Sequence, residues 1–274
     1  HLETSGIRMK VALVQMTMGA DKAKNIAEAV SHIRKAKEHG AQLVALPECF
    51  NSPYGTKYFA EYAEEVPGGA TCRALADVAA ECGVCVVGGT LPERCDGRLY
   101  NTCPVFDERG NLLAQHRKMH LFDIDIPGKI TFRESDSLSA GERVTSFEWR
   151  GVRIGVGICY DIRFPEYAHL LACCSILIYP SAFNMTTGPK HWSLLARARA
   201  NDQQLWVAVV SPARDHAGEY VAWGHTMLVN PWAEVVEELE DLPGMVVADI
   251  VRKAVTCFNA GDVAEKSYSR IIIM

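Results

Sequence analysis

Short apolar runs alternate along this chain with longer segments in which apolar residues recur every three or four positions. A short apolar run bounded by turn residues predicts a buried strand, whereas the longer spacing predicts a helix with one apolar face. In the first half the predicted strands are residues 10–15, 42–46 and 84–88, and the predicted helices are residues 22–39 and 71–82. Strands and helices therefore alternate, which favours a layered α/β protein.

The second half continues this alternation after a predicted β-hairpin. Residues 101–106 and 112–117 flank the turn sequence Asp-Glu-Arg-Gly-Asn, which is typical of a hairpin connection. Thr71 is predicted to cap the helix that begins there, and Gly40 to end the helix before it. The later predicted elements are strands at 152–158, 175–179, 205–211 and 245–250, helices at 165–172 and 189–203, and two strands within 222–239 around Asn230-Pro231.

The pattern contains no long linker, internal repeat or low-complexity tract. We expect residues 1–8 to be a remnant of cloning and Met9 to be the native start, because this segment lacks the apolar stretch of an export signal. Residues 9–274 are then predicted to form a single domain. The tail after about Thr256 carries no clear periodicity apart from three consecutive isoleucines at 271–273.

Composition and charge narrow the classes of partner. Apolar residues make up 49% and charged residues 22% of the 274 residues, which excludes intrinsic disorder as the main state. The net charge of −5 argues against a nucleic-acid partner, and no apolar run approaches the roughly 18 residues of a membrane helix. We therefore expect neither nucleic acid nor membrane as a partner.

The ten cysteines are expected to remain reduced, because no export signal is visible. This favours a cytoplasmic location, with a mitochondrial one as the alternative. Cys82 and Cys85 form a CxxC pair, but no second pair with metal-binding spacing accompanies it, so we expect no zinc or redox site there.

Cys159 is the first candidate for chemistry, because it follows a glycine-containing apolar strand and precedes a predicted helix. Gly157 is expected to permit a tight strand-to-helix turn, which would expose the side chain and direct backbone N–H groups at one point. A helix N-terminus would also favour the thiolate. The alternative is a core cysteine at the end of a strand.

Three charged residues could assist a thiol nucleophile. Glu48 ends an apolar strand, where the carboxyl edge of a sheet can face a crevice, and is either a general base with a raised pKa or a solvated loop residue. Lys118 closes a predicted strand within a basic cluster, which is either a solvated turn or a site with one lysine turned inward. Glu134 cannot be distinguished locally from a loop glutamate. The chain has no phosphate-binding loop, dinucleotide fingerprint or HExxH motif, so the implied chemistry needs no cofactor or metal.

Three segments taken together resemble the signature segments of the nitrilase superfamily, the carbon–nitrogen hydrolases, in order and spacing. They are Leu46-Pro47-Glu48-Cys49-Phe50, the HRKMHLF sequence at 116–122 and Gly157-Ile158-Cys159-Tyr160-Asp161. The resemblance implies a catalytic set of Glu48, Lys118 and Cys159, with Glu134 as a second glutamate. It also implies an α/β fold, a four-layer αββα sandwich with two mixed β-sheets between helix layers, and a homodimer formed through the flanking helices. The tail after Lys253 departs from the family pattern.

Further segments resemble the omega-amidase branch of that superfamily; they lie at residues 50–55, 121–132, 182–189, 211–215 and 220–225. This resemblance implies hydrolysis of the terminal amide of 2-oxoglutaramate or 2-oxosuccinamate through a cysteine acyl-thioester, releasing ammonia and the 2-oxo dicarboxylate. Two alternatives stay open. One is a related amidase acting on deaminated glutathione or on N-carbamoyl amines, and the other is a non-catalytic interaction module.

Such a small-molecule amide substrate carries a carboxylate, and a buried carboxylate needs a cationic partner. Arg163, four residues after Cys159, is the predicted partner because its planar fork binds carboxylates at two points. The alternative for Arg163 is an ion pair with Glu166. The backbone N–H of Tyr160 is predicted to hold the oxyanion together with Lys118. The predicted pocket walls are Tyr54, Phe183 and Thr187.

Overall fold

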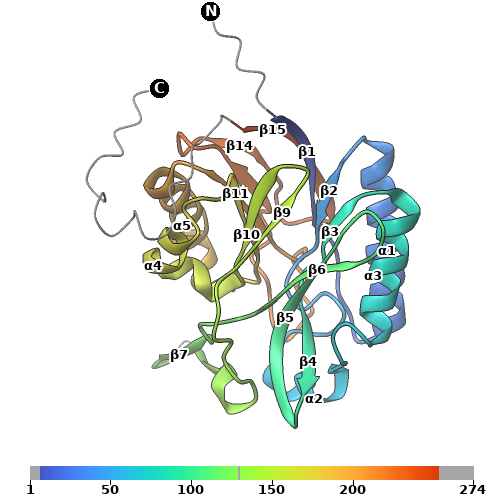
Figure 1. The fold of residues 1–274 in the computed structure, drawn as a ribbon. Helices are drawn as coiled ribbons and strands as arrows, with labels where there is room; N and C mark the ends of the chain where they lie inside the picture. Colours follow the sequence, from blue (N-terminus) through green and yellow to red (C-terminus); the bar gives the residue numbers. More distant parts are fainter. Residues whose placement is uncertain (1–6, 129, 253–274) are drawn as a thin grey trace, which may run out of the picture.

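Two β-sheets face each other at the centre of the molecule, and helices cover their outer faces (Figure 1). The computed structural model describes residues 7–128 and 130–252. Helices α1 (Lys22–Glu38) and α3 (Ala70–Cys82) lie on one side, and α4 (Pro165–Leu170) and α5 (Gly188–Gln203) lie on the other. The expected four-layer αββα sandwich is therefore the observed architecture.

The first sheet is mixed and has seven strands in the order β15-β1-β2-β3-β5-β4, with β6 pairing to β5. β1, β2 and β3 run parallel, whereas β15 pairs antiparallel with β1. β5 and β6 form the predicted hairpin. The strands are β1 (Ile7–Gln15), β2 (Leu43–Ala45), β3 (Cys85–Val87), β4 (Leu91–Cys95), β5 (Arg98–Phe106), β6 (Leu112–Arg117) and β15 (Gly244–Arg252).

The second sheet has six strands in the order β14-β13-β12-β11-β10-β9. Its three central strands β10, β11 and β12 are parallel, and the outer pairs are antiparallel. The strands are β9 (Thr145–Trp149), β10 (Val152–Val156), β11 (Ile176–Pro180), β12 (Trp206–Val210), β13 (Met227–Val229) and β14 (Val235–Glu238). The parallel strands of both sheets are joined through helices or long loops, as parallel connections require.

Alternation of side chains along β1 explains the layers. Val11 and Leu13 belong to the apolar core between the two sheets, whereas Ala12 and Val14 pack against the helices outside the first sheet. A strand segment that is covered on both faces is apolar at successive positions, which is why residues 11–14 of β1 show no polar alternation in the sequence.

Several local predictions need correction. β1 begins at Ile7, three residues earlier than predicted. Thr71 does not cap α3: the helix begins at Ala70, and the Thr71 hydroxyl instead donates to Glu64 Oε1 over 2.8 Å. The elements that periodicity missed are α2 (Thr56–Tyr62), β4, β9, the hairpin β7 (Asp123–Ile126) and β8 (Ile130–Arg133), and the two 3₁₀ helices η1 (Glu134–Asp136) and η2 (Cys159–Arg163).

Within residues 7–128 and 130–252, no helix is both long and apolar enough to cross a membrane. Seven cysteines of these ranges are free thiols: Cys49, Cys72, Cys82, Cys85, Cys95, Cys103 and Cys159. Cys257, the isoleucines at 271–273 and residues 1–6 of the expected cloning remnant lie outside the described residues.

Candidate active site

Glu48, Lys118, Glu134 and Cys159, which are spread over more than 100 positions, meet in one buried cluster. Lys118 Nζ donates to Glu48 Oε1 and to Glu134 Oε1, each over 2.9 Å. The Cys159 thiol is hydrogen-bonded to Glu48. The two glutamates and the lysine are fully buried, and Cys159 is 4% exposed. The structure thus brings together all four residues that the sequence singled out.

Each of the four residues lies just beyond the end of a strand or at the start of a 3₁₀ helix. Glu48 follows β2, Lys118 follows β6, Glu134 begins η1 and Cys159 begins η2. Side chains alternate along a strand, so Lys118 turns inward while its neighbour Arg117 faces away and pairs with Glu93 over 2.6 Å. The basic cluster around Lys118 is therefore not a solvated turn.

The sharp turn at the nucleophile is made by Cys159 itself, which has φ 43°. This left-handed conformation costs a non-glycine residue free energy, and such strain is typical of functional turns. The expectation that Gly157 supplies the turn is wrong, since its φ is not positive and the left-handed residue is Cys159. A Cβ at Gly157 would lie 2.4 Å from an atom of the Tyr179 ring. Gly157 is needed because the backbone packs closely against that ring.

Besides the Cys159 thiol, three N–H donors hold Glu48 in place. Oε1 accepts from Lys118 and from Asn101 Nδ2 over 2.9 Å, and Oε2 accepts from the backbone N–H of Ala182 over 2.8 Å. Burial raises the pKa of Glu48, an effect that the ammonium of Lys118 opposes and the nearby Glu134 reinforces. A carboxylate with a raised pKa is a stronger base towards an adjacent proton.

Lys118 and Cys159 respond to the same surroundings in different ways. Burial disfavours the Lys118 ammonium, but the carboxylates of Glu134 and Glu48 outweigh it and raise the pKa of Lys118 well above its ordinary value. Burial and the charge of Glu48 raise the pKa of the Cys159 thiol well above its ordinary value. The resting site therefore holds a neutral thiol beside an ionised lysine.

Glu134 is fixed by the loop that carries it and by a tyrosine. Its Oε2 accepts from the backbone N–H of Phe122 over 2.7 Å, and its Oε1 accepts from the Tyr54 hydroxyl over 2.8 Å. The Tyr54 ring lies 4.3 Å from that of Tyr220. Tyr54 thus orients Glu134 and does not line the hollow at Cys159, although the sequence suggested that it forms a wall of the substrate pocket.

A hollow opens directly at Cys159 and contains most of the predicted substrate-binding residues. Tyr160, Arg163, Phe183 and Thr187 line it as expected. Sequence reasoning missed Asn101, although a lone amide in an apolar strand was an available signal for it. It also missed the other residues that line the hollow. The missed lining residues are Phe122, Ala182, Asn184 and Tyr220.

Arg163 reaches this hollow between two aromatic rings. Its guanidinium carbon lies 5.4 Å from the centre of the Tyr160 ring and 5.1 Å from that of Phe183. One terminal nitrogen lies 3.2 Å from His191 Nδ1, and the buried Nε has no hydrogen-bond partner in the described part of the chain. No ion pair joins Arg163 to Glu166 within the same ranges. The guanidinium is consequently available to a ligand.

Asp161 ties the segment that carries Lys118 to the turn that carries Cys159. One carboxylate oxygen accepts from the backbone N–H and Nδ1 of His120 over 2.9 and 2.7 Å. The other accepts from Ile158 N–H over 2.9 Å and lies 3.1 Å from His116 Nε2. Burial works against ionisation, but the hydrogen bonds from His116 and His120 prevail and lower the pKa of Asp161 to about 2.

The low pKa of Asp161 predicts an acid-sensitive contribution to stability. A folded-state pKa of about 2 against an ordinary 3.8 stabilises the fold at pH values above 3.8, and this contribution is lost as the pH falls towards 2. In full it amounts to about 2 kcal/mol, of which about 1 kcal/mol is lost by pH 3. Urea unfolding at pH 6 and pH 3 should show that Asp161→Asn, already less stable, loses less on acidification than the wild type. The control is Glu237→Gln, which removes an exposed carboxylate. Equal losses of unfolding free energy in the wild type and Asp161→Asn would contradict the acid-sensitive role of Asp161.

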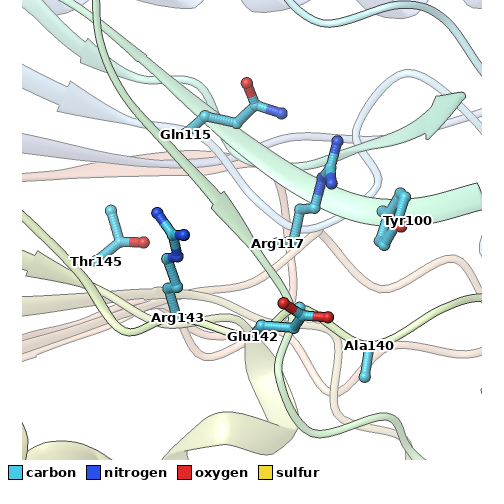
Figure 2. A pocket seen from close by; sticks show the side chains of 8 residues that line it. Tyr100, Gln115, Arg117, Ala140, Glu142, Arg143 and Thr145 are labelled. Carbon is cyan, nitrogen blue, oxygen red and sulfur yellow. The ribbon is translucent and has the colours of Figure 1, made fainter. Parts of the chain in front are cut away.

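A larger hollow lies elsewhere, between β6 and β9. It has a volume of about 440 Å³, and Figure 2 shows Arg117, Arg143 and Gln115 around it. Arg117 is already paired with Glu93 and stacked on Tyr100, 3.9 Å from the ring centre. None of the four clustered residues lines this hollow, so its size does not make it the reactive site. Its lining residues are Tyr100, Gln115, Arg117, Ala140, Gly141, Glu142, Arg143 and Thr145.

The sequence and the fold are both similar to those of known proteins. The model of the carbon–nitrogen hydrolase family matches residues 10–259. The chain is 54% identical to omega-amidase NIT2 of Bos taurus over 88% of both proteins, and 53% identical to omega-amidase NIT2 of Homo sapiens over the same shares. Among solved structures, Saccharomyces cerevisiae Nit3, of the nitrilase superfamily, superposes with a TM-score of 0.82 at 40% identity, covering 89% of this chain and 90% of Nit3. An amidase from Nesterenkonia sp. AN1, solved with the acetamide moiety of fluoroacetamide covalently added at its active-site cysteine, gives 0.79 at 25% identity, covering 92% and 93%.

Proposed function

Because the chain belongs to the carbon–nitrogen hydrolase family, we propose that it is an omega-amidase that hydrolyses the terminal amide of small 2-oxo acids such as 2-oxoglutaramate and 2-oxosuccinamate. The observation that carries this proposal is the buried cluster in which Lys118 bridges two glutamates beside the Cys159 thiol. Each step of this hydrolysis of a small-molecule amide can be assigned to residues of this chain.

In the first half of the reaction, Glu48 takes the thiol proton and Cys159 attacks the amide carbonyl. Glu48 suits this role because it is hydrogen-bonded to the thiol and burial raises its pKa. Lys118 and the backbone N–H of Tyr160 hold the tetrahedral oxyanion, and loss of one such donor costs about 3 kcal/mol of barrier stabilisation. Glu48 then gives its proton to the departing ammonia, leaving an acyl-thioester on Cys159.

In the second half, Glu48 takes a proton from water, and the resulting hydroxide attacks the thioester carbonyl. Collapse of this second tetrahedral species breaks the C–S bond and returns the proton to Cys159. Glu134 keeps Lys118 oriented throughout, since Phe122 and Tyr54 fix its two oxygens. The neutral resting thiol is therefore restored at the end of each cycle.

Arg163 binds the substrate carboxylate in this proposal. Its guanidinium lies in the hollow at Cys159 with one unpartnered N–H, and Phe183 and Thr187 form the adjacent walls. The aromatic enclosure by Phe122, Phe183 and Tyr220 favours a short substrate over a glutathione derivative. For this reason we place hydrolysis of deaminated glutathione or of N-carbamoyl amines second among the candidate functions.

Arg163→Lys should raise KM about tenfold and lower kcat only modestly. Lysine keeps the charge but loses the two-point grip on a carboxylate that lies away from the reacting carbonyl. Steady-state ammonia release gives both constants, and continued hydroxamate formation with hydroxylamine reports intact acyl-thioester chemistry. Glu166→Gln is the matched control and should leave KM unchanged. If Arg163→Lys has no effect on KM, the carboxylate binds elsewhere.

The proposed activity itself is tested by ammonia release from purified protein. We expect faster turnover of 2-oxoglutaramate and 2-oxosuccinamate than of deaminated glutathione or an N-carbamoyl amine. Higher kcat/KM for either of the latter would replace the proposal with the second candidate, and no turnover of any of the four would argue for the interaction module.

We also propose that the protein works as a homodimer in the cytoplasm, without nucleic-acid or membrane partners. Leu170 on α4 and Leu194 on α5 are 65% and 63% exposed, and such apolar side chains on outer helices suit a subunit interface. Light scattering after size exclusion gives the mass in solution, and a monomer at micromolar concentration would contradict the dimer.

A further inference from the structure

Asn184 stands in the hollow at Cys159 with its side-chain amide clamped in one orientation. Its Oδ1 accepts three hydrogen bonds, from Thr186 N–H over 3.0 Å, from Thr187 N–H over 2.9 Å and from the Thr187 hydroxyl over 3.1 Å. Backbone N–H groups can only donate, so the oxygen must face them and the NH₂ group must face the other way. The amide cannot flip without losing these bonds.

The NH₂ group of Asn184 has no acceptor among residues 7–128 and 130–252, although the residue is only 7% exposed. Buried polar groups without partners are rare in folded proteins, and each one calls for an explanation. Arg163 Nε is a second unpartnered N–H donor among the residues that line the same hollow. The hollow therefore offers donors to a ligand whose non-reacting end carries acceptors.

We propose that Asn184 Nδ2 donates to the 2-oxo oxygen of the substrate while Arg163 binds the neighbouring carboxylate. This assignment rests on the proposed function and makes Asn184 a specificity-determining residue. A ketone oxygen accepts a hydrogen bond, whereas the ammonium of an amino acid amide such as glutamine is itself a donor. The fixed NH₂ group consequently selects 2-oxo acid amides and rejects the corresponding amino acid amides.

Asn184→Asp isolates this donor, because aspartate keeps an oxygen for the three donors from Thr186 and Thr187 and replaces only NH₂ by an acceptor. The experiment compares kcat/KM for three substrates: 2-oxoglutaramate, glutaramate, which has CH₂ in place of the ketone, and L-glutamine. The wild type should favour 2-oxoglutaramate over glutaramate by at least about tenfold, since a site built to hydrogen-bond a polar group rejects the analogue that lacks it. Asn184→Asp should bring this ratio close to one and raise the relative rate with L-glutamine. Its extra charge weakens binding of the shared carboxylate in both of the first two substrates, so their ratio reports the ketone contact.

Met185→Gln, an exposed neighbour, is the control and should keep the wild-type ratio. A wild-type protein that turns over 2-oxoglutaramate and glutaramate equally well overturns the assignment, whether or not Asn184→Asp folds. An unchanged preference in a folded Asn184→Asp variant overturns it as well. Neither result bears on the proposed function, which fails if the wild type does not hydrolyse 2-oxoglutaramate or if deaminated glutathione or an N-carbamoyl amine gives a higher kcat/KM.

Discussion

Cys159→Ala should abolish amide hydrolysis while the protein stays folded. Removal of a catalytic nucleophile costs on the order of 10⁶-fold in kcat, so the remaining ammonia release should lie near background. The fold should survive because the substitution removes one sulfur from a side chain at the edge of the core and breaks only its hydrogen bonds to Glu48 and to the backbone of Ala182. Ammonia release and thermal unfolding of the same preparation test both parts.

Cys159→Ser should fail as well, because a hydroxyl is far harder to ionise than a thiol beside the same carboxylate. Cys103→Ala is the matched control: Cys103 is also a buried free thiol, and its loss should lower stability without removing activity. Appreciable ammonia release by purified Cys159→Ala would show that another group is the nucleophile.

Glu48→Gln is the second substitution expected to inactivate the enzyme, with a fall in kcat/KM of about 10³-fold or more. Glutamine has the same shape but cannot take the thiol proton, cannot protonate ammonia and cannot activate water, so both halves of the reaction should slow. Lys118 keeps Glu134 as a partner, which should preserve the site. A burst of ammonia without turnover would instead confine Glu48 to the hydrolytic half.

The wild-type pH profile provides an independent check on Glu48. Its carboxylate form is required, so kcat/KM should fall as the pH drops through its pKa, and burial places that pKa above the ordinary 4.5. The acid limb should therefore lie above 4.5 and disappear from the residual activity of Glu48→Gln. Glu166→Gln, an exposed isosteric change, should leave the limb in place, and an acid limb at or below 4.5 in the wild type would refute the role.

Elements with strong local signals were predictable from the sequence. The apolar run of β1 and the spacing of Ala29, Ile33 and Ala36 in α1 correspond to buried faces, so the order of apolar residues predicts these elements. The hairpin of β7 and β8 left no such signal, because its strands are four residues long and β7 is not buried. Its segment therefore looked like a loop.

The sequence by itself determined the succession of strands and helices and, through its three signature segments, the candidates Glu48, Lys118 and Cys159. The tertiary structure alone decided that these groups touch, since contact between residues 48, 118 and 159 depends on how two sheets pack. It also reassigned Tyr54 to Glu134 and brought Asn184 into the hollow. Hydrogen bonds and burial depend on distances in space, and residues far apart in the chain come within contact distance only when the two sheets and their helices pack together.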